Sequence, residues 1–296
     1  MTPGNDAMRR RFASLVSMTE GALSECFTGD PPHRALLDAM RYSLNAGGKR
    51  VRAVLTLEFA RAAGGGERAA LGAACAAEML HAYSLIHDDL PCMDDSDTRR
   101  GKPSNHVVFG EWMATLAGDA LQAAAFERVL LSPLPPERTA RMALTLARAA
   151  GPDGICGGQA LDMAAEGKRL AVGQIEQIHA RKTAALFMAC ARMGVESAGG
   201  GDALVESAER YAESLGLAFQ IRDDVLDVES DSETLGKPAQ ADAYNVKSTF
   251  ASLLGAEECE RLIREETQKA IDALAPAFAD GAFLVWLART LSERKG

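Results

Sequence analysis

The chain has 296 residues, 47% of them hydrophobic, and a formal net charge of -9 at pH 7. This length and hydrophobic content allow one large core, and the acidic balance excludes the basic surface that binding to nucleic acid requires. Alanine-rich stretches favour helices, and alternating β-branched runs that would predict strands are nearly absent, so we expect an all-α fold. Short breaks without a long linker predict a single domain over residues 1–296.

Three features bear on where the protein resides. Glu78 and His81 interrupt the apolar run before Asp88, so we expect no membrane span and no membrane partner. No apolar segment follows the N-terminal arginines, which argues against a targeting peptide. The six cysteines show no C-x-x-C pairing, which is typical of reduced thiols. Together these features predict a cytoplasmic protein.

In chain order, the first candidate element is the basic turn Gly47-Gly48-Lys49-Arg50-Val51-Arg52, at a predicted helix start. Free backbone N–H groups at a helix start, together with flexible glycines, favour a phosphate group. Lys49 and Arg52 are three residues apart and share a helix face. The spacing of a P-loop is absent, and taken alone such a turn is more often a surface feature than a binding site.

The next element is the acidic segment Asp88-Asp89-Leu90-Pro91-Cys92-Met93-Asp94-Asp95. A regular helix would turn Asp94 away from Asp88, but Pro91 predicts that the helix ends near Leu90. A loop can then bring Asp94 back beside Asp88. His81 lies two helical turns before Asp88 on the same stripe, and Arg99 and Arg100 follow the segment as candidate phosphate ligands.

A second acidic segment, Asp223-Asp224-Val225-Leu226-Asp227, echoes the first one. Its spacing puts Asp223 and Asp227 on one helix face, with Gln220 one turn earlier. Either segment alone would ordinarily be a solvated acidic patch, but the two together, each behind an apolar helix, indicate cation binding. Sparse carboxylates with room for water suit Mg²⁺, and the loop pattern of an EF-hand is absent.

Together these residues resemble the trans-isoprenyl diphosphate synthase family, and within it the bacterial farnesyl diphosphate synthases. The resemblance covers nearly the whole chain. Besides the basic turn and the two acidic segments, the ordered matches are His81 to Ile86, Arg99-Arg100-Gly101, Ala117-Gly118-Asp119-Ala120-Leu121, Gly157-Gly158-Gln159, Lys182-Thr183, Leu235-Gly236-Lys237 and Lys247-Ser248-Thr249.

The resemblance implies an isoprenoid synthase helical bundle around a deep central cavity, acting as a homodimer. It implies a prenyltransferase that joins isopentenyl diphosphate to allylic diphosphates, with three Mg²⁺ ions for which Mn²⁺ can substitute. By the resemblance, the metal ligands are Asp88, Asp94 and Asp223, with Asp89, Asp224 and Asp227 beside them. The isopentenyl diphosphate would bind Lys49, Arg52, His81 and Arg100, and the allylic diphosphate would bind Arg99, Lys182 and Lys237. Thr183 and Gln220 would stabilise the carbocation.

Product length depends, in this family, on residues just before the first acidic segment. Here these are Tyr83 and Ser84, and the bulk of Tyr83 predicts a fifteen-carbon product. Tyr83 as a plain packing aromatic remains an alternative, which leaves open a geranylgeranyl diphosphate synthase with a twenty-carbon product. A terpene cyclase would not need the isopentenyl diphosphate ligands, and a non-catalytic prenyltransferase subunit would typically lack one acidic segment.

Overall fold

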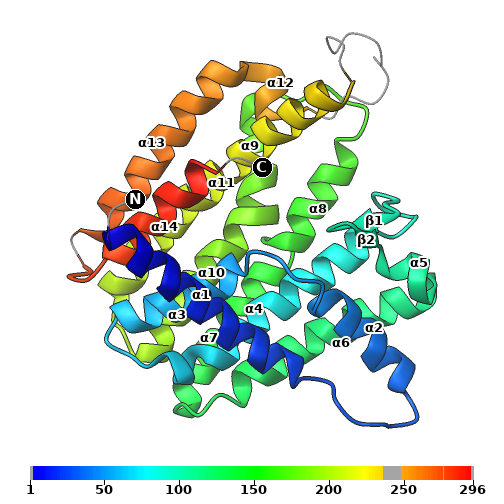
Figure 1. The fold of residues 1–296 in the computed structure, drawn as a ribbon, viewed down its shortest axis with the longest axis horizontal. Coiled ribbons are helices and arrows are strands. Elements are labelled where there is room, and N and C mark those ends of the chain that lie inside the picture. Colours follow the sequence, from blue (N-terminus) through cyan, green and yellow to red (C-terminus); the bar gives the residue numbers. More distant parts are fainter. Residues whose placement is uncertain (1–2, 236–247, 276, 295–296) are drawn as a thin grey trace. The chain divides into compact units, whose positions relative to one another are not determined.

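Helices make up most of the regular structure in the computed structural model, which describes residues 3–235, 248–275 and 277–294 (Figure 1). Within those residues, the strands are β1 (Thr98–Arg99) and β2 (Lys102–Pro103), which pair antiparallel as a short hairpin. The predicted all-α fold is confirmed. The chain divides into two compact units, and each is described by itself. A single domain over residues 1–296 stays a prediction.

The first unit comprises residues 1–147 and 192–201. It contains β1, β2, the C-terminal end of α10 and the following helices: α1 (Pro3–Ser24), α2 (Arg34–Leu44), α3 (Val51–Ala62), α4 (Glu67–Asp88), α5 (Asn105–Phe109), α6 (Glu111–Leu130) and most of α7 (Pro136–Ala150). α4 packs against α1, α2, α3 and α6. Its small side chains Ala73, Ala74 and Ala77 are fully buried, which allows neighbouring helices to approach closely.

α4 also differs from what the sequence analysis expected of it. In length and composition it is apolar enough to cross a membrane, with a mean hydropathy of 1.3 over its most apolar window. That window is 67% buried inside the structure, and the carboxylate of Glu78 within it pairs with Arg50. The core helix of a globular protein has this kind of burial. The absence of a membrane span therefore stays a prediction.

The second unit comprises residues 148–191 and 202–296. Its elements are α8 (Ile155–Ala164), α9 (Val172–His179), the π-helix η1 (Ala180–Ala184), the first half of α10 (Ala185–Ala198), α11 (Asp202–Leu235), α12 (Phe250–Leu254), α13 (Ala256–Leu274) and α14 (Ala282–Ser292). α11 packs against α9, η1, α12, α13 and α14. A buried cluster that includes Ile175, Val225 and Phe250 joins α9, α11 and α12 behind the second acidic segment.

Candidate functional site

The first acidic segment folds back on the end of α4. The helix ends at Asp88 and Asp89 is its C-cap, within two residues of the end that Pro91 predicts. The backbone N–H of Asp94 then donates to the carbonyl of Asp88 at 2.9 Å, and that of Ser96 donates to the carbonyl of Asp89 at 3.2 Å. The predicted return of Asp94 to the side of Asp88 is therefore present. Asp94 is exposed, whereas Asp88 is buried.

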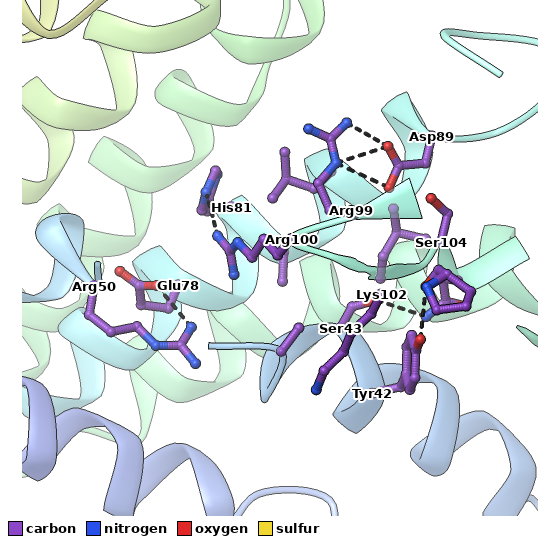
Figure 2. Close-up of a pocket in the computed structure, with 16 residues that line it drawn as sticks. Tyr42, Ser43, Arg50, Glu78, His81, Asp89, Arg99, Arg100, Lys102 and Ser104 are labelled. Carbon is purple, nitrogen blue, oxygen red and sulfur yellow. Dashed lines mark hydrogen bonds and ion pairs between the residues drawn. The ribbon is translucent and has the colours of Figure 1, made fainter. Parts of the chain in front are cut away.

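Asp89 is engaged by an arginine of the same unit. Its buried carboxylate accepts from Arg99 Nη2 at 2.5 Å and from Arg99 Nε at 3.0 Å (Figure 2). Burial lowers the pKa of Arg99, but the hydrogen bonds and charge of Asp89 outweigh it, so that the pKa is raised overall. A bidentate contact of this kind sets the direction of the guanidinium. Asp89 thus holds Arg99, the last residue of β1, in place.

A small cavity of about 30 Å³ lies between α2, α4 and the β1–β2 hairpin. We call it the cationic pocket, because its lining includes His81, Arg99, Arg100 and Lys102 (Figure 2). Arg100 donates from Nη1 to the carbonyl of Gly47, and its Nη2 lies 3.4 Å from His81 Nε2. The cationic pocket thus brings together His81 and Arg100, which were both predicted to bind isopentenyl diphosphate. Its lining also includes Arg99, which was predicted to bind the allylic diphosphate.

His81 is electrostatically distinct within the cationic pocket. Burial, followed by the positive charges of Arg52 and Arg100, holds the pKa of His81 well below its usual range. The imidazole is therefore neutral at pH 7 and can share one hydrogen bond with a neighbouring guanidinium without adding charge. An anion that enters the cationic pocket would meet arginines as its cationic partners and His81 as a neutral one.

The basic turn lies at the start of α3, as predicted. Val51 is the first residue of α3, and Lys49 is exposed just before it. Arg52 is half-buried and close enough to lower the pKa of His81. Neither Lys49 nor Arg52 is part of the cavity lining that the described residues form. Arg52 therefore acts on His81 electrostatically, whereas Lys49 is exposed to solvent at the edge of the turn.

The two residues predicted to set product length lie one turn before Asp88. Tyr83 is buried, and its ring packs edge-to-face against His87 with a centroid distance of 5.4 Å. His87 lies against Gly118 of α6, where even a Cβ atom would collide with the imidazole. Ser84 Oγ donates to the carbonyl of His81 at 2.9 Å, which occupies it within the helix. Tyr83 is thus the bulky member of the pair, fixed by its neighbour on α4.

A larger pocket of about 530 Å³ lies in the second unit, among α8, α9, η1 and α11. We call it the acidic pocket, because Asp162, Glu166, Asp224 and Asp227 contribute to its lining. Lys182 also lines it and pairs with Asp162 Oδ2 at 2.8 Å. Lys182 and Thr183 lie in the π-helix η1, a distortion that is found most often at functional sites.

A chain of hydrogen bonds crosses the acidic pocket. Thr183 Oγ1 donates to Gln220 Oε1 at 3.0 Å, and Gln220 Nε2 donates to Asp224 Oδ1 at 3.3 Å. The second oxygen of Asp224 accepts from the backbone N–H of Phe250 at 2.9 Å. Burial raises the pKa of Asp224 to about 6, although these hydrogen bonds oppose the shift. The acidic pocket therefore contains a buried carboxylate whose charged form is costly without a cation.

The helix face that the second acidic segment presents differs from the expected one. Gln220, Asp224 and Asp227 line the acidic pocket, whereas Asp223 does not belong to that lining. Asp223 instead pairs with Arg294, whose guanidinium lies 3.9 Å from the ring centroid of Phe219. Each residue turns about 100° along a helix, so Asp223 and Asp224 point in different directions. Lys237, predicted for the allylic diphosphate, lies outside the described residues.

The donor chemistry of the acidic pocket fits a hard divalent cation. Carboxylate oxygens of Asp224 and Asp227 line a space with room for water, and Mg²⁺ binds through one or two carboxylates while keeping several waters. Among the residues that the structure describes, no three His, Cys, Asp or Glu side chains converge on one point as a ready-made metal cage. Asp224 and Asp227 are the carboxylates of the predicted metal set that this pocket brings together.

Four residues of the two pockets were missed by the sequence analysis. Arg50 and Glu78 form a buried pair in the lining of the cationic pocket. In the acidic pocket, Asp162 pairs with Lys182, and His179 Nε2 lies 3.9 Å from Asp224 Oδ2. Glu78 carried a signal, since it is a charged residue inside an apolar helical run. Asp162 and His179 follow no pattern of spacing that sets them apart from other polar residues on helices.

Comparisons with known proteins agree with this geometry. The family model described as polyprenyl synthetase matches residues 33–278. A farnesyl diphosphate synthase of Geobacillus stearothermophilus is 44% identical over 262 residues, covering 88% of each chain. The chloroplastic geranylgeranyl pyrophosphate synthase 3 of Arabidopsis thaliana is 45% identical over 266 residues, covering 87% of this chain and 73% of the relative.

Solved structures show the same likeness. An FPP/GFPP synthase from Zymomonas mobilis superposes with a TM-score of 0.87 at 33% identity, covering 97% of this chain and 99% of the other. A geranyltransferase from Legionella pneumophila has the same TM-score at 30% identity, covering 98% of both chains. The isoprenoid synthase fold that the sequence resemblance implies is confirmed.

Proposed function

Because the chain belongs to the polyprenyl synthetase family and is therefore a short-chain prenyltransferase, we propose that it makes the fifteen-carbon farnesyl diphosphate. It would join isopentenyl diphosphate first to dimethylallyl diphosphate and then to geranyl diphosphate. The family requires a divalent metal in general, and we propose Mg²⁺, in up to three ions, with Mn²⁺ as a substitute. The observation that carries the proposal is the presence of separate cationic and acidic pockets, each built from matched motif residues.

We assign the substrates as the family resemblance implies, and the charges of the residues support this assignment. Lys49, Arg52, His81 and Arg100 would bind the isopentenyl diphosphate, since three of them are cations and His81 is a neutral partner. Arg99 and Lys182 would bind the allylic diphosphate, and Asp89 and Asp162 would hold these two cations in place. Lys237, outside the described residues, keeps its predicted role here. Guanidinium groups offer bidentate contacts to phosphate and lysines offer point charges.

The metal ligands in this proposal are Asp88, Asp94 and Asp223, with Asp224 and Asp227 beside them. When bound, the metal would supply positive charge to the departing diphosphate. Asp89 is occupied by Arg99, so we assign it to positioning that arginine. The raised pKa of Asp224 supports a cation nearby, because burial makes its carboxylate costly when it is charged and unpaired.

The chemistry proceeds by heterolysis of the allylic C–O bond, whose electron pair leaves with the diphosphate. The double bond of isopentenyl diphosphate then attacks the allylic cation, and the new carbon–carbon bond leaves the positive charge on the adjoining carbon. Loss of a proton to the departing diphosphate restores a double bond. Thr183 and the Gln220 amide oxygen, joined at 3.0 Å, would direct oxygen dipoles toward the cation and keep water away.

Product length rests on Tyr83. Relatives named farnesyl diphosphate synthase and geranylgeranyl pyrophosphate synthase match at similar identity, so a twenty-carbon product is the alternative. The buried Tyr83 ring, packed on His87, supports a floor for a fifteen-carbon chain. Tyr83→Ala should lengthen the product by one or more five-carbon units. An unchanged product length in that variant would move the determinant elsewhere.

The reaction is tested by incubating the purified protein with isopentenyl diphosphate, dimethylallyl diphosphate and Mg²⁺, then separating the dephosphorylated products by chain length. A fifteen-carbon alcohol that disappears with EDTA supports the proposal. A twenty-carbon alcohol would keep the enzyme class and overturn the assigned length. No product, with either dimethylallyl or geranyl diphosphate, would favour a cyclase or a non-catalytic subunit.

We also propose a cytoplasmic homodimer. The large apolar side chains Val107, Val108, Trp112 and Leu116 are exposed on α5 and α6, and Trp112 is 67% exposed. A gathering of exposed apolar groups on adjoining helices supports an interface. Light scattering after size exclusion should give twice the chain mass, and Trp112→Glu should shift it toward the monomer. A monomeric wild-type protein would overturn this part of the proposal.

A further inference from the structure

The basic turn has an unusual backbone. Gly47, Gly48 and Arg50 all have positive φ angles, of 82°, 122° and 49°. Glycine adopts this region without strain, but an arginine with a Cβ atom does not. Strain of this kind persists only where the surrounding structure holds the residue firmly in place. The side chain of Arg50 therefore needs contacts that compensate for its backbone.

Arg50 has such contacts, and they connect three helices. Its side chain is 4% exposed, Nη2 donates to the carbonyl of Leu44 at the end of α2 at 2.9 Å, and Nη1 pairs with Glu78 Oε2 on α4 at 3.2 Å. Nε lies 3.5 Å from Glu20 Oε1 on α1. Because Nη1 and Nη2 are already bound inside the protein, the guanidinium cannot turn toward a ligand without breaking buried contacts.

The carboxylate of Glu78 contacts both Arg50 and the start of α3. Its side chain is 3% exposed, and its Oε1 accepts from the backbone N–H of Ala53 at 3.2 Å. That N–H belongs to the first turn of α3, where backbone donors have no partner within the helix. Glu78 therefore binds the turn through Arg50 and the start of α3 through Ala53. It also lies one helical turn before His81 on α4.

We propose that Arg50 and Glu78 are a positioning pair for the homoallylic diphosphate site. The pair holds the basic turn against α4, and so sets Lys49 and Arg52 at a defined distance from His81. This inference rests on the proposed function, since it takes these three residues as ligands of isopentenyl diphosphate. Arg50 and Glu78 both line the cationic pocket, but their polar groups are already bound inside the protein. Both therefore act through the backbone of the turn and not as ligands of the diphosphate.

The test compares steady-state kinetics of Arg50→Gly, Glu78→Gln and the double variant with wild type. Glycine adopts the left-handed backbone without strain and removes the whole arginine side chain, while glutamine keeps an acceptor for the backbone N–H of Ala53. Misplacement of binding groups by about 1 Å can cost about 100-fold. We therefore expect KM for isopentenyl diphosphate to rise about 10- to 100-fold in each variant. The kcat and the KM for the allylic diphosphate should stay within about threefold.

Arg61→Met is the matched control. Arg61 pairs with the fully buried Glu58 at 2.6 Å on the same helix α3, but neither residue lines the cationic pocket. Its loss should lower thermal stability without changing KM for isopentenyl diphosphate. The double variant Arg50→Gly with Glu78→Gln leaves no unpaired buried charge, so its thermal stability should exceed that of Arg50→Gly while its KM stays raised.

The outcomes separate the competing explanations. A raised KM in Arg50→Gly alone, with Glu78→Gln unchanged, would make Arg50 a direct ligand and overturn the positioning role. An unchanged KM in both variants, or an equal rise in Arg61→Met, would also overturn it. Calorimetric binding of isopentenyl diphosphate gives the same comparison without turnover. A wild-type protein that binds this substrate but forms no product would therefore overturn the proposed function and leave the positioning pair supported or refuted by its own variants.

Discussion

The cationic pocket and the acidic pocket differ in size and in how their charges are paired. The cationic pocket measures about 30 Å³, and its arginines are already bound, Arg99 to Asp89 and Arg100 to the carbonyl of Gly47. The acidic pocket measures about 530 Å³ and contains Asp224, whose pKa burial raises to about 6. A space of about 30 Å³ holds about two waters, so a diphosphate can enter the cationic pocket only if side chains of its lining move.

The paired aspartates of the two acidic segments show a second contrast. In each pair the second aspartate is buried and hydrogen-bonded inside its own unit, Asp89 to Arg99 and Asp224 to Gln220 and Phe250. The first pair, however, ends a helix, while the second lies within one. Similar sequence therefore produces a positioned arginine in one unit and a buried carboxylate with a raised pKa in the other. Four experiments test these differences between the two pockets and the two acidic segments.

The largest effect should come from the first aspartate of each pair. Asp88→Ala and Asp223→Ala should each reduce turnover by about 1000-fold or more, because metal charge on a leaving diphosphate contributes several kcal/mol. Asp95→Asn is the control, since Asp95 is exposed and its left-handed backbone suits asparagine. Turnover measured at saturating Mg²⁺ decides the matter. If neither alanine variant is slower, the metal assignment is wrong.

The next effect should separate the two substrates. Arg100→Gln should raise KM for isopentenyl diphosphate, and Lys182→Gln should raise KM for the allylic diphosphate, each by about 10- to 100-fold for one charged hydrogen bond. The reason is that Arg100 lines the cationic pocket and Lys182 the acidic one. Initial rates with each substrate varied in turn provide the measurement. A rise in the same KM for both variants would break the division between the pockets.

A smaller effect concerns stability and pH without metal. The folded pKa of Asp224, about 6, lies above its usual value of 3.8, so the stability it contributes is full below about pH 4 and is lost as the pH rises through 6. Asp224→Asn should remove up to about 3 kcal/mol of this pH dependence. Urea unfolding in EDTA from pH 4 to 8 measures it. The Asp153→Asn variant, at an exposed residue outside the acidic pocket, should keep the wild-type slope, and an unchanged slope in Asp224→Asn would refute the assignment.

The smallest effect should come from the hydroxyl of Thr183. Thr183→Val keeps the shape of the side chain but removes its hydrogen bond to Gln220, which should lower kcat by about fivefold, or about 1 kcal/mol. Thr145→Val is the control. Its hydroxyl donates to Glu196 at 3.2 Å, and both residues belong to the first unit, outside the lining of the acidic pocket. Single-turnover rates with bound substrates give the comparison. Equal effects of the two substitutions would assign Thr183 to stability alone.

Short sequence motifs predicted the end of α4 and the basic turn, because the conformation of each depends on residues that are neighbours in the sequence. Pro91 predicts the end of α4, and the backbone bond from Asp94 to Asp88 follows from that turn. The basic turn at the start of α3 follows from its glycines. The face of the second acidic segment was predicted less well, because the 3.6-residue period allows Gln220 to share a stripe with either Asp223 or Asp224.

Composition, helix period and short motifs are local properties, and they were enough to predict the all-α class, the family, the acidic segments and the basic turn. Packing brings together the charged pairs, which are Asp89 with Arg99, Asp162 with Lys182, Asp223 with Arg294, and Arg50 with Glu78. The two partners of each pair belong to different segments of the chain, and the burial that shifts the pKa of Asp224 and His81 is a property of packing. Spacing along a chain cannot reveal which distant side chains packing brings into contact.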